Sequence, residues 1–252
     1  MPCFVRAQNK MLYFGDNPIQ LHGFGVGTWL NMEHFMLGVP TPDSMIRQSF
    51  TEIYGNQVAS DFFRNFTTSF FTQEDINLIK RCGVNFLRVP FNYRLFIDDN
   101  HTGIYREEGF QAFQTLLDLC EKNEIFVMPD LHTTPGGQNP DWHSDNRTGY
   151  TQLWEFEVFR KQIVSLWGEI ARRFRQYHYL LGYDILNEPA MASTDAMNGF
   201  YQAVTCAIRQ HDKNHAIVLE GDMFAMDFSA LAVPKDDNII LSFHYYPTVW
   251  HP

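Results

Sequence analysis

Short apolar runs alternate along the chain with longer segments in which apolar residues recur every three or four positions. The short runs read as buried parallel strands, which are apolar on both faces, and the longer segments read as amphipathic helices. The predicted strands span 21–29, 84–89, 125–131, 180–186, 215–220 and 238–246. The predicted helices span 44–54, 72–82, 107–123, 153–177, 195–211 and 224–231. This alternation predicts an α/β fold built on a parallel sheet.

The apolar run 180–186 ends abruptly at a polar pair, Asn187 and Glu188. Pro189 has no backbone N–H to give to a sheet, so the strand ends at or before it. The polar pair is therefore expected at the carboxyl end of a parallel strand, where α/β proteins bind their ligands. An isolated Asn-Glu-Pro is as often an ordinary turn, but the strand in front of it favours a site.

Other polar residues fall at or near the ends of the neighbouring predicted strands. Arg88 lies near the end of its strand, and a charge within an apolar strand is costly unless it is paired. His132 follows another strand, and His244 and Tyr246 close the last one. Each also has a plainer interpretation, such as a buried ion pair for Arg88 or a satisfied core histidine for His132. Their shared position at strand ends favours a site.

Length and charge bound the class of protein. The chain has 252 residues, a typical length for one whole (β/α)8 barrel. Its formal net charge of −10 argues against nucleic acid as a partner and is compatible with neutral sugars. No window carries the roughly 18 apolar residues of a membrane span, so no membrane partner is expected. The four cysteines are scattered and no spacing matches a common metal motif, so neither metal nor cofactor is expected.

The first residues lack the basic and then apolar layout of a signal peptide. We therefore expect either a cytoplasmic protein or a secreted one whose leader has already been removed. Residues 11–22 read as an amino-terminal hairpin, because two short apolar runs flank the turn formed by Gly15, Asp16 and Asn17. No second domain or internal repeat is evident in the residue pattern.

Three motifs at the strand ends resemble glycoside hydrolase family 5, a family of retaining enzymes in the large cellulase-like clan. They are Asn187-Glu188-Pro189, Asp130-Leu131-His132-x-x-Pro135-Gly136-x-Gln138-Asn139 and His244-x-Tyr246. The resemblance implies a (β/α)8 TIM barrel, with about six of its eight βα units in this chain. It also implies hydrolysis of a β-linked glucan or oligosaccharide, of the cellulase or β-1,3-1,4-glucanase kind, by double displacement between two carboxyl groups. Endo and exo modes both stay open.

The resemblance also assigns roles to single residues. Glu188 matches the proton donor, whose pKa should then be raised, and Asn187 matches the residue that holds the sugar's 2-hydroxyl. Arg88 matches an arginine that keeps the nucleophile ionised. The other catalytic matches, which line the subsite of the reacting sugar or contact the carboxyl groups, are His132, His244 and Tyr246. The candidate substrate-binding residues are Trp29, Glu33, Asn139, Trp142 and Asn146.

Two of the substrate-binding candidates have equally plain alternatives. Glu33 also reads as a solvated loop carboxylate. Trp142 lies in a polar loop, where an indole ring can stack on a sugar or plug the rim of a barrel.

The chain departs from the family in its number of strands. A complete barrel needs eight, so we interpret residues 1–252 as one incomplete catalytic barrel domain with a hairpin at about 11–22. In the family the nucleophilic Glu follows strand seven, so we expect it beyond residue 252 and expect this chain alone to be inactive. If the chain is complete, Glu220 is the fallback nucleophile. Open barrel edges predict self-association or a complementing chain.

Two other classes of function stay open. A non-catalytic carbohydrate-binding barrel fits a missing nucleophile, and tight sugar binding without turnover would favour it. A metal-dependent barrel hydrolase would use His132, His244 and an acid as ligands, and bound zinc or sensitivity to chelators would favour it.

Overall fold

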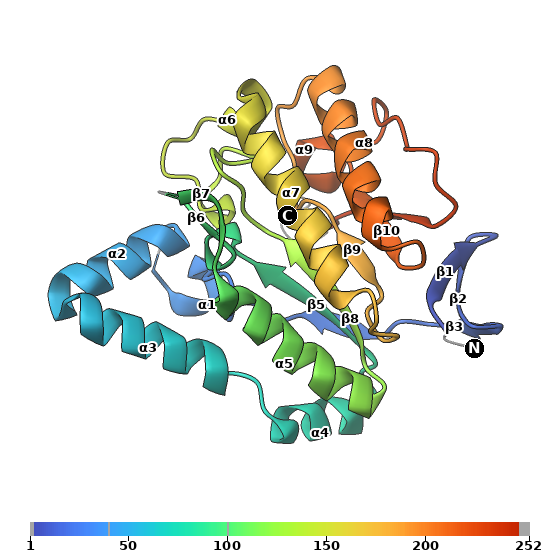
Figure 1. Ribbon diagram of the computed structural model, residues 1–252, viewed down its shortest axis with the longest axis horizontal. Coiled ribbons are helices and arrows are strands. Elements are labelled where there is room, and N and C mark those ends of the chain that lie inside the picture. The colour runs from blue at the N-terminus through green and yellow to red at the C-terminus, as the bar shows by residue number, and fades with distance from the viewer. Residues whose placement is uncertain (1–2, 40, 100, 247–252) are drawn as a thin grey trace.

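The computed structural model describes residues 3–39, 41–99 and 101–246, and its centre is a parallel sheet (Figure 1). The sheet contains β4 (Gly23–Gly25), β5 (Phe86–Phe91), β8 (Phe126–Leu131), β9 (Gly182–Asp184), β10 (Ala216–Glu220) and β11 (Ile239–Ser242). Its strand order is β11-β10-β9-β8-β5-β4. A doubly wound sheet reverses its order at a switch point, whereas this order runs in one direction, as in a (β/α)8 barrel. The prediction of a partial TIM barrel is confirmed.

Helices between the strands cover the outer face of the sheet (Figure 1). They are α4 (Gln73–Arg81), α5 (Glu107–Asn123), α7 (Glu157–Phe174) and α8 (Thr194–His211). A capping box between Thr72 and Asp75 begins α4, and α5 has the bounds that its periodicity predicted. The single helix predicted over 153–177 is wrong. Phe156 adopts an extended backbone there and separates α6 (Gln152–Glu155) from α7.

Apolar side chains between the sheet and its helices form the main core. The rings of Phe91 on β5, Trp167 on α7 and Tyr183 on β9 meet edge to face, with both pairs of centroids 5.8 Å apart. The indole N–H of Trp167 also donates to the carbonyl of Ile185, 3.0 Å away. These contacts fix the strands that carry the polar residues on their other face.

An antiparallel meander at the amino terminus covers the bottom of the sheet. The predicted hairpin is present as β2 (Met11–Phe14) and β3 (Asn17–Ile19), and β1 (Val5–Gln8) pairs with the outer side of β2. The turn before β2 places Asn9 and Lys10 at positive φ without a glycine, so no turn signal revealed β1. The buried Val5 belongs to a second small core with Phe126 and Met128 of β8.

The segment after β4 carries helices of its own. They are α1 (His34–Leu37), α2 (Asp43–Tyr54) and α3 (Asn56–Ser69), of which only α2 was predicted. Gly55, at φ +83°, turns the chain between α2 and α3. The rings of Phe50 and Phe62 stack with centroids 4.7 Å apart across the two helices. Figure 1 shows this pair of helices projecting beside α5 at one side of the barrel.

The remaining elements are short. A hairpin of β6 (Ile97–Asp98) and β7 (His101–Tyr105) follows the 3-10 turn Tyr93–Leu95, and a second such turn spans Trp142–Ser144. The helix predicted over 224–231 is wrong, because α9 (Asp222–Ala225) is a single turn in which Met223 and Phe224 have left-handed φ and ψ.

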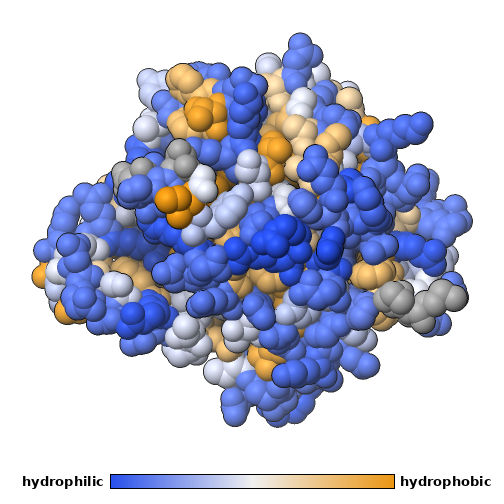
Figure 2. Space-filling model, in the orientation of Figure 1, coloured by the Kyte–Doolittle hydropathy of each residue, from blue (hydrophilic) through white to orange (hydrophobic). Residues whose placement is uncertain are grey.

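The helix-bearing surface is largely hydrophilic, with apolar groups gathered in small patches (Figure 2). No helix in the described part of the chain combines the length and the apolar composition that a membrane span requires. Within the described ranges, β4 and β11 each have a strand on one side only.

Candidate active site

The carboxyl ends of the sheet strands bring the predicted polar residues together. Arg88 lies on β5, His132 directly follows β8 and Glu188 follows β9. Glu220 ends β10, and His244 lies two residues after β11. The five side chains come from five successive strands, and each touches at least one residue on another strand or the loop after it.

Arg88 is the hub of a buried ion cluster. Its Nη1 lies 3.1 Å from Asp130 Oδ2, its Nε 2.9 Å from Asp184 Oδ2 and its Nη2 3.0 Å from Glu220 Oε1. Nη2 also donates to Asn187 Oδ1, at 2.9 Å. Burial opposes the charged form, but the three carboxyl groups raise the pKa of the Arg88 guanidinium, so it stays protonated. The sequence expectation of a paired arginine is met by three carboxyl groups at once.

Two of the carboxyl groups around Arg88, those of Asp184 and Asp130, have pKa values shifted in opposite directions. Burial raises the pKa of Asp184 well above its ordinary value, and Glu220 and Asp130 add to the rise. For Asp130, burial also opposes ionisation, but Arg88 and His132 outweigh it and lower its pKa. The surroundings thus favour the neutral form of Asp184 and the ionised form of Asp130, although both carboxyl groups share Arg88.

Glu188 is held at both its side chain and its backbone. Its Oε1 lies 2.5 Å from His244 Nδ1, and its Oε2 lies 3.0 Å from His143 Nε2. Its backbone N–H donates to Glu220 Oε2 at 2.6 Å, and its carbonyl accepts from Asn139 Nδ2 at 2.8 Å. Its φ of 47° lies in the left-handed region, which residues with a side chain adopt at a cost. These contacts fix one orientation of the carboxylate.

The predicted rise in the pKa of Glu188 is wrong. Burial acts in the predicted direction, but the hydrogen bonds from His143 and His244 outweigh it and hold the pKa of Glu188 below its ordinary value. Burial likewise opposes the charged form of His244, yet Glu188 and Glu220 raise its pKa to about 10. The described arrangement therefore pairs an ionised Glu188 with a protonated His244.

His132 and Asn187 complete this wall of the site. His132 Nδ1 lies 2.6 Å from Asp130 Oδ2, and its Nε2 lies 3.4 Å from Asn187 Nδ2 and 3.7 Å from Glu33 Oε1. Burial opposes the charged form of His132, but Asp130 raises its pKa. Glu33, which had a plain alternative as a solvated loop carboxylate, is thus near the cluster, with 15% of its side chain exposed.

Two aromatic candidates lie at the rim. The ring of Tyr246 is half exposed, and its centroid lies 6.4 Å from that of His244. Trp142 is partly buried and meets His143 edge to face, with centroids 5.7 Å apart. Both rings are therefore close to the histidines that hold Glu188.

Three predicted substrate-binding residues occupy different places. Trp29 is 3% exposed, stacks on Phe70 and donates its indole N–H to the carbonyl of Thr67, so its ring is not open to the Glu188 cluster. Asn139 is fully buried, and its amide donates to the backbone carbonyl of Glu188. Asn146 is also buried, and its amide donates to the carbonyl of Asn139 at 2.8 Å. The two asparagines build the wall of the site.

Glu220 is poorly placed for its fallback role as nucleophile. Its side chain is fully buried, Oε1 lies within 3.1 Å of both Arg88 and His244, and Oε2 accepts from the backbone of Glu188. Both oxygens are thus engaged by the protein. This geometry suits a residue that positions its neighbours.

The sequence interpretation missed the roles of His143 and Asp184. His143 lies in a loop with no periodicity, and its only signal was a histidine close to the Asn139 motif. Asp184 had a stronger signal, because a carboxyl group inside an apolar strand needs a partner and Arg88 is such a partner. Among the described residues, no group of three or more His, Cys, Asp and Glu side chains is arranged to hold a metal ion.

A sheet wound in one direction, with its polar cluster at the carboxyl ends of the strands, defines a barrel protein of the TIM class. The family model described as cellulase, glycosyl hydrolase family 5, matches residues 50–251. The chain therefore belongs to glycoside hydrolase family 5.

Similar proteins include a β-xylosidase of Phanerodontia chrysosporium, 38% identical over 96% of this chain and 52% of that protein. Endoglucanase C of Acetivibrio thermocellus is 26% identical over 73% of this chain and 53% of its own length. Among solved structures, Cel5A of Thermotoga maritima with cellobiose has a TM-score of 0.59 at 21% identity, over 71% of this chain and 54% of that one. The chain thus spans about half the length of these relatives.

Proposed function

We propose that this chain is the acid/base-bearing part of a retaining hydrolase that acts on β-linked glycans. The observation that carries the proposal is the fixed carboxylate of Glu188 at the carboxyl end of β9, with Asn187 beside it and tied to Arg88. Glu188 protonates the leaving oxygen and then activates water, and Asn187 holds the 2-hydroxyl of the reacting sugar. The nucleophilic carboxylate, about 5–5.5 Å away in retaining enzymes, is expected beyond residue 252.

His143 and His244 favour the ionised form of Glu188, which is the form that the base half of this cycle needs, and the substrate brings about the acid form. A sugar that displaces His143 from Oε2 removes one of the two interactions that lower the pKa, so the pKa of Glu188 then rises. His244, protonated and 2.5 Å from Oε1, is the nearest source of the proton. The acid form is thus made only when the leaving group is in place.

The substrate class is argued from the relatives. One is named for β-xylosides and others for glucans, so the shared feature is a β-linked glycan rather than one sugar. The loops that select the sugar differ most among such enzymes, so the linkage and the endo or exo mode are decided outside the Glu188 cluster.

The test is Glu188→Gln in the full-length protein, assayed with aryl β-glycosides. Loss of the acid should lower kcat/KM, which reports the first step alone, by at least about 100-fold for a poor leaving group, but much less for dinitrophenol, which departs without a proton. Glu74→Gln, at an exposed position on α4, is the matched control and should keep full activity. Equal losses for both leaving groups would contradict the acid role.

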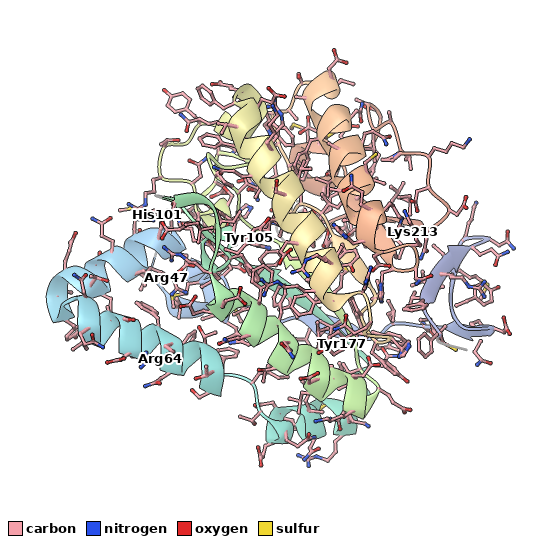
Figure 3. The ribbon with its side chains drawn as sticks, viewed as in Figure 1. Arg47, Arg64, His101, Tyr105, Tyr177 and Lys213 are labelled. Atoms are coloured by element: carbon pink, nitrogen blue, oxygen red, sulfur yellow. The ribbon has the colours of Figure 1, made fainter. Side chains whose placement is uncertain are left out.

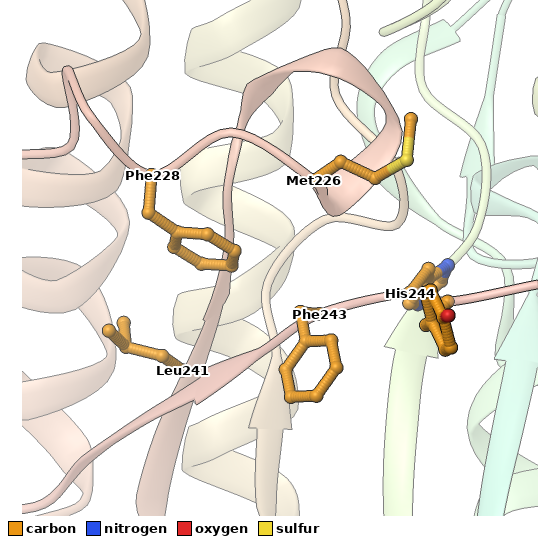
Figure 4. Close-up of a pocket in the computed structure, with 6 residues that line it drawn as sticks. Met226, Phe228, Leu241, Phe243 and His244 are labelled. Carbon is orange, nitrogen blue, oxygen red and sulfur yellow. The ribbon is translucent and has the colours of Figure 1, made fainter.

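A complementing chain, or a second copy, is the partner we propose for the open sheet edge. A cavity of about 490 Å³ lies beside β11 and is lined by Met226, Phe228, Leu241, Phe243, His244 and Tyr245 (Figure 4). Its lining is mostly apolar and borders the Glu188 cluster through His244. A partner seated there would cover apolar surface and complete the wall of the site.

A further inference from the structure

A second cavity lies apart from the Glu188 cluster, between α3, α5 and the turn Tyr93–Leu95. Its volume of about 520 Å³ is within the range of small-molecule sites. Trp29, which was predicted to bind substrate but is not open to the Glu188 cluster, is one of the residues that line this cavity. The two helices come from distant parts of the chain, and Figure 1 shows them running beside each other.

Four arginines line this cavity: Arg47, Arg64, Arg94 and Arg106. Among the described lining residues, Glu108 is the one acid. Each arginine has an aspartate partner, such as Asp43 for Arg47 and Asp98 for Arg106, both with an N···O distance of 2.8 Å. These aspartates are not among the lining residues, so they pair with the sides of the guanidinium groups that face away from the cavity. Apart from Glu108, the charged groups that a ligand in the cavity meets are guanidinium donors.

The guanidinium groups have donor capacity left for a ligand. Each carries five N–H groups, and the aspartate pairs use one or two of them. Arg47 Nη2 is buried and makes no hydrogen bond to the described residues. Arg47 also lies 4.5 Å above the centroid of Phe63, another lining residue, which orients its planar group. Arg47 on α2 and Arg64 on α3 lie on the same side of the molecule (Figure 3). An acceptor with two oxygens suits such a donor.

The rest of the lining selects the body of the ligand. Phe71 and the ring surface of Phe63 that Arg47 leaves uncovered are apolar, and Ser60, Thr67 and Gln111 add hydroxyl and amide groups to the lining. Ring faces beside hydroxyl and amide groups suit a sugar ring, which has apolar C–H faces and polar edges. We propose that this cavity is a binding site for an acidic sugar, whose carboxylate is held by the arginines and whose ring lies against the phenylalanines.

The proposal is tested by comparing two small probes that differ only in the carboxylate. Methyl β-D-glucuronide and methyl β-D-glucoside are titrated into the protein, and binding is followed by amide chemical shifts of α3 and α5. We expect the glucuronide to bind at least about ten times more tightly, and its affinity to fall as salt is raised. Equal affinity for both probes would overturn the proposal.

Substitutions locate the site. Arg64 and Arg106 are 59% and 45% exposed, so the double variant R64Q/R106Q should fold normally and lose at least about five-fold in glucuronide affinity. Arg81→Gln, at the exposed end of α4, is the matched control and should change nothing. Thr115→Phe, which adds a ring to the cavity wall, should also weaken binding.

A last variant separates this site from the proposed catalytic one. Glu188→Gln should leave glucuronide affinity unchanged, because none of the residues around Glu188 lines this cavity. Loss of glucuronide binding in that variant, with no effect of R64Q/R106Q, would assign the acidic sugar to the Glu188 cluster and overturn the second site.

Discussion

Glu188 combines a costly backbone conformation with four polar contacts. A left-handed φ costs a residue with a side chain roughly 1–2 kcal/mol, and Glu188 adopts one at 47°. Two histidines, an asparagine and the carboxylate of Glu220 offset this cost. Strain of this kind gathers at functional sites because it fixes a reactive group in one place.

We expect His143→Leu to raise the pKa of Glu188. The substitution removes one of the two hydrogen bonds that keep the carboxylate ionised, while burial, which acts in the opposite direction, remains. The measurement is the pH titration of the Glu188 carboxyl carbon by NMR, assigned with Glu188→Gln. His101→Leu, at an exposed position far from the cluster, is the control. An unchanged titration midpoint in His143→Leu would contradict the assigned contact.

His244 should make stability depend on alkaline pH. Its pKa is about 10 in the folded protein against 6.5 as a free side chain, so its pairs with Glu188 and Glu220 stabilise fully below about pH 6.5. That contribution is lost as pH rises from about 6.5 through about 10. The difference in unfolding free energy between the natural protein and His244→Asn, from urea titrations, should therefore shrink over this window. A difference that is constant with pH would show that His244 is not protonated in the folded state.

The residues of the cluster differ in how well their sequence reveals them. Arg88 and Asp184 are charged positions in apolar strands, so the cost of burial alone calls for a partner. Glu188 was visible because Pro189 fixes the end of its strand. His143 was not visible, because nothing in a loop sequence says which way a side chain points. The pKa of Glu188 was mispredicted for the same reason, since burial was foreseen and its two histidine partners were not.

At the scale of elements, the close approach of β9 and β10 depends on one glycine. A Cβ placed on Gly182 would lie 2.4 Å from the carbonyl oxygen of Ala216 and 2.9 Å from its Cβ. These contacts involve backbone, which cannot move aside without disturbing the strand pairing that carries Asp184 and Glu220. The glycine thus sets the spacing of two strands that hold the ion cluster.

Gly182→Ala should therefore destabilise the fold by about 1–3 kcal/mol, the usual range for overpacking. The matched control is Gly199→Ala, at an exposed position inside α8, where a Cβ meets nothing within 4 Å. That variant should stabilise the protein by roughly 0.5–1 kcal/mol, because alanine favours a helix over glycine. Urea unfolding measures both, and effects of the same sign would contradict this account.

The elements that were predicted well are those with a clear period and clear ends. Helix α5 has an unbroken apolar stripe, so both of its bounds agree with the sequence. In the segment 153–177 the apolar stripe continues through Phe156, although the backbone is extended there. Side-chain periodicity does not reveal a break of one residue, so a single helix was predicted. Helix α3 was read as part of a long connection, because half-exposed apolar residues such as Val58 add to those like Phe62 that stack on α2.

At the scale of the molecule, the sheet has two open edges. In the part of the chain that the structure describes, β4 and β11 each lack a second neighbouring strand. Leu241 and Phe243, on and just after β11, are 49% and 71% exposed. Unpaired backbone groups beside apolar side chains favour pairing with another chain. The order of the strands could be predicted from their alternation with helices. The backbone partners of the two edge strands could not, because no strand among the described residues pairs with the outer side of β4 or β11.

We therefore expect this chain by itself to associate in solution through the β11 edge. Phe243→Lys should reduce association, since a charge on an edge strand disfavours pairing with a second chain. Val158→Lys, on the outer face of α7 and 55% exposed, replaces an equally accessible apolar residue away from the edge and should leave association unchanged. Sedimentation velocity at several protein concentrations measures both variants. A concentration-independent monomer that melts cooperatively would mean that the open edge needs no partner, and the proposed complementing chain would then be abandoned.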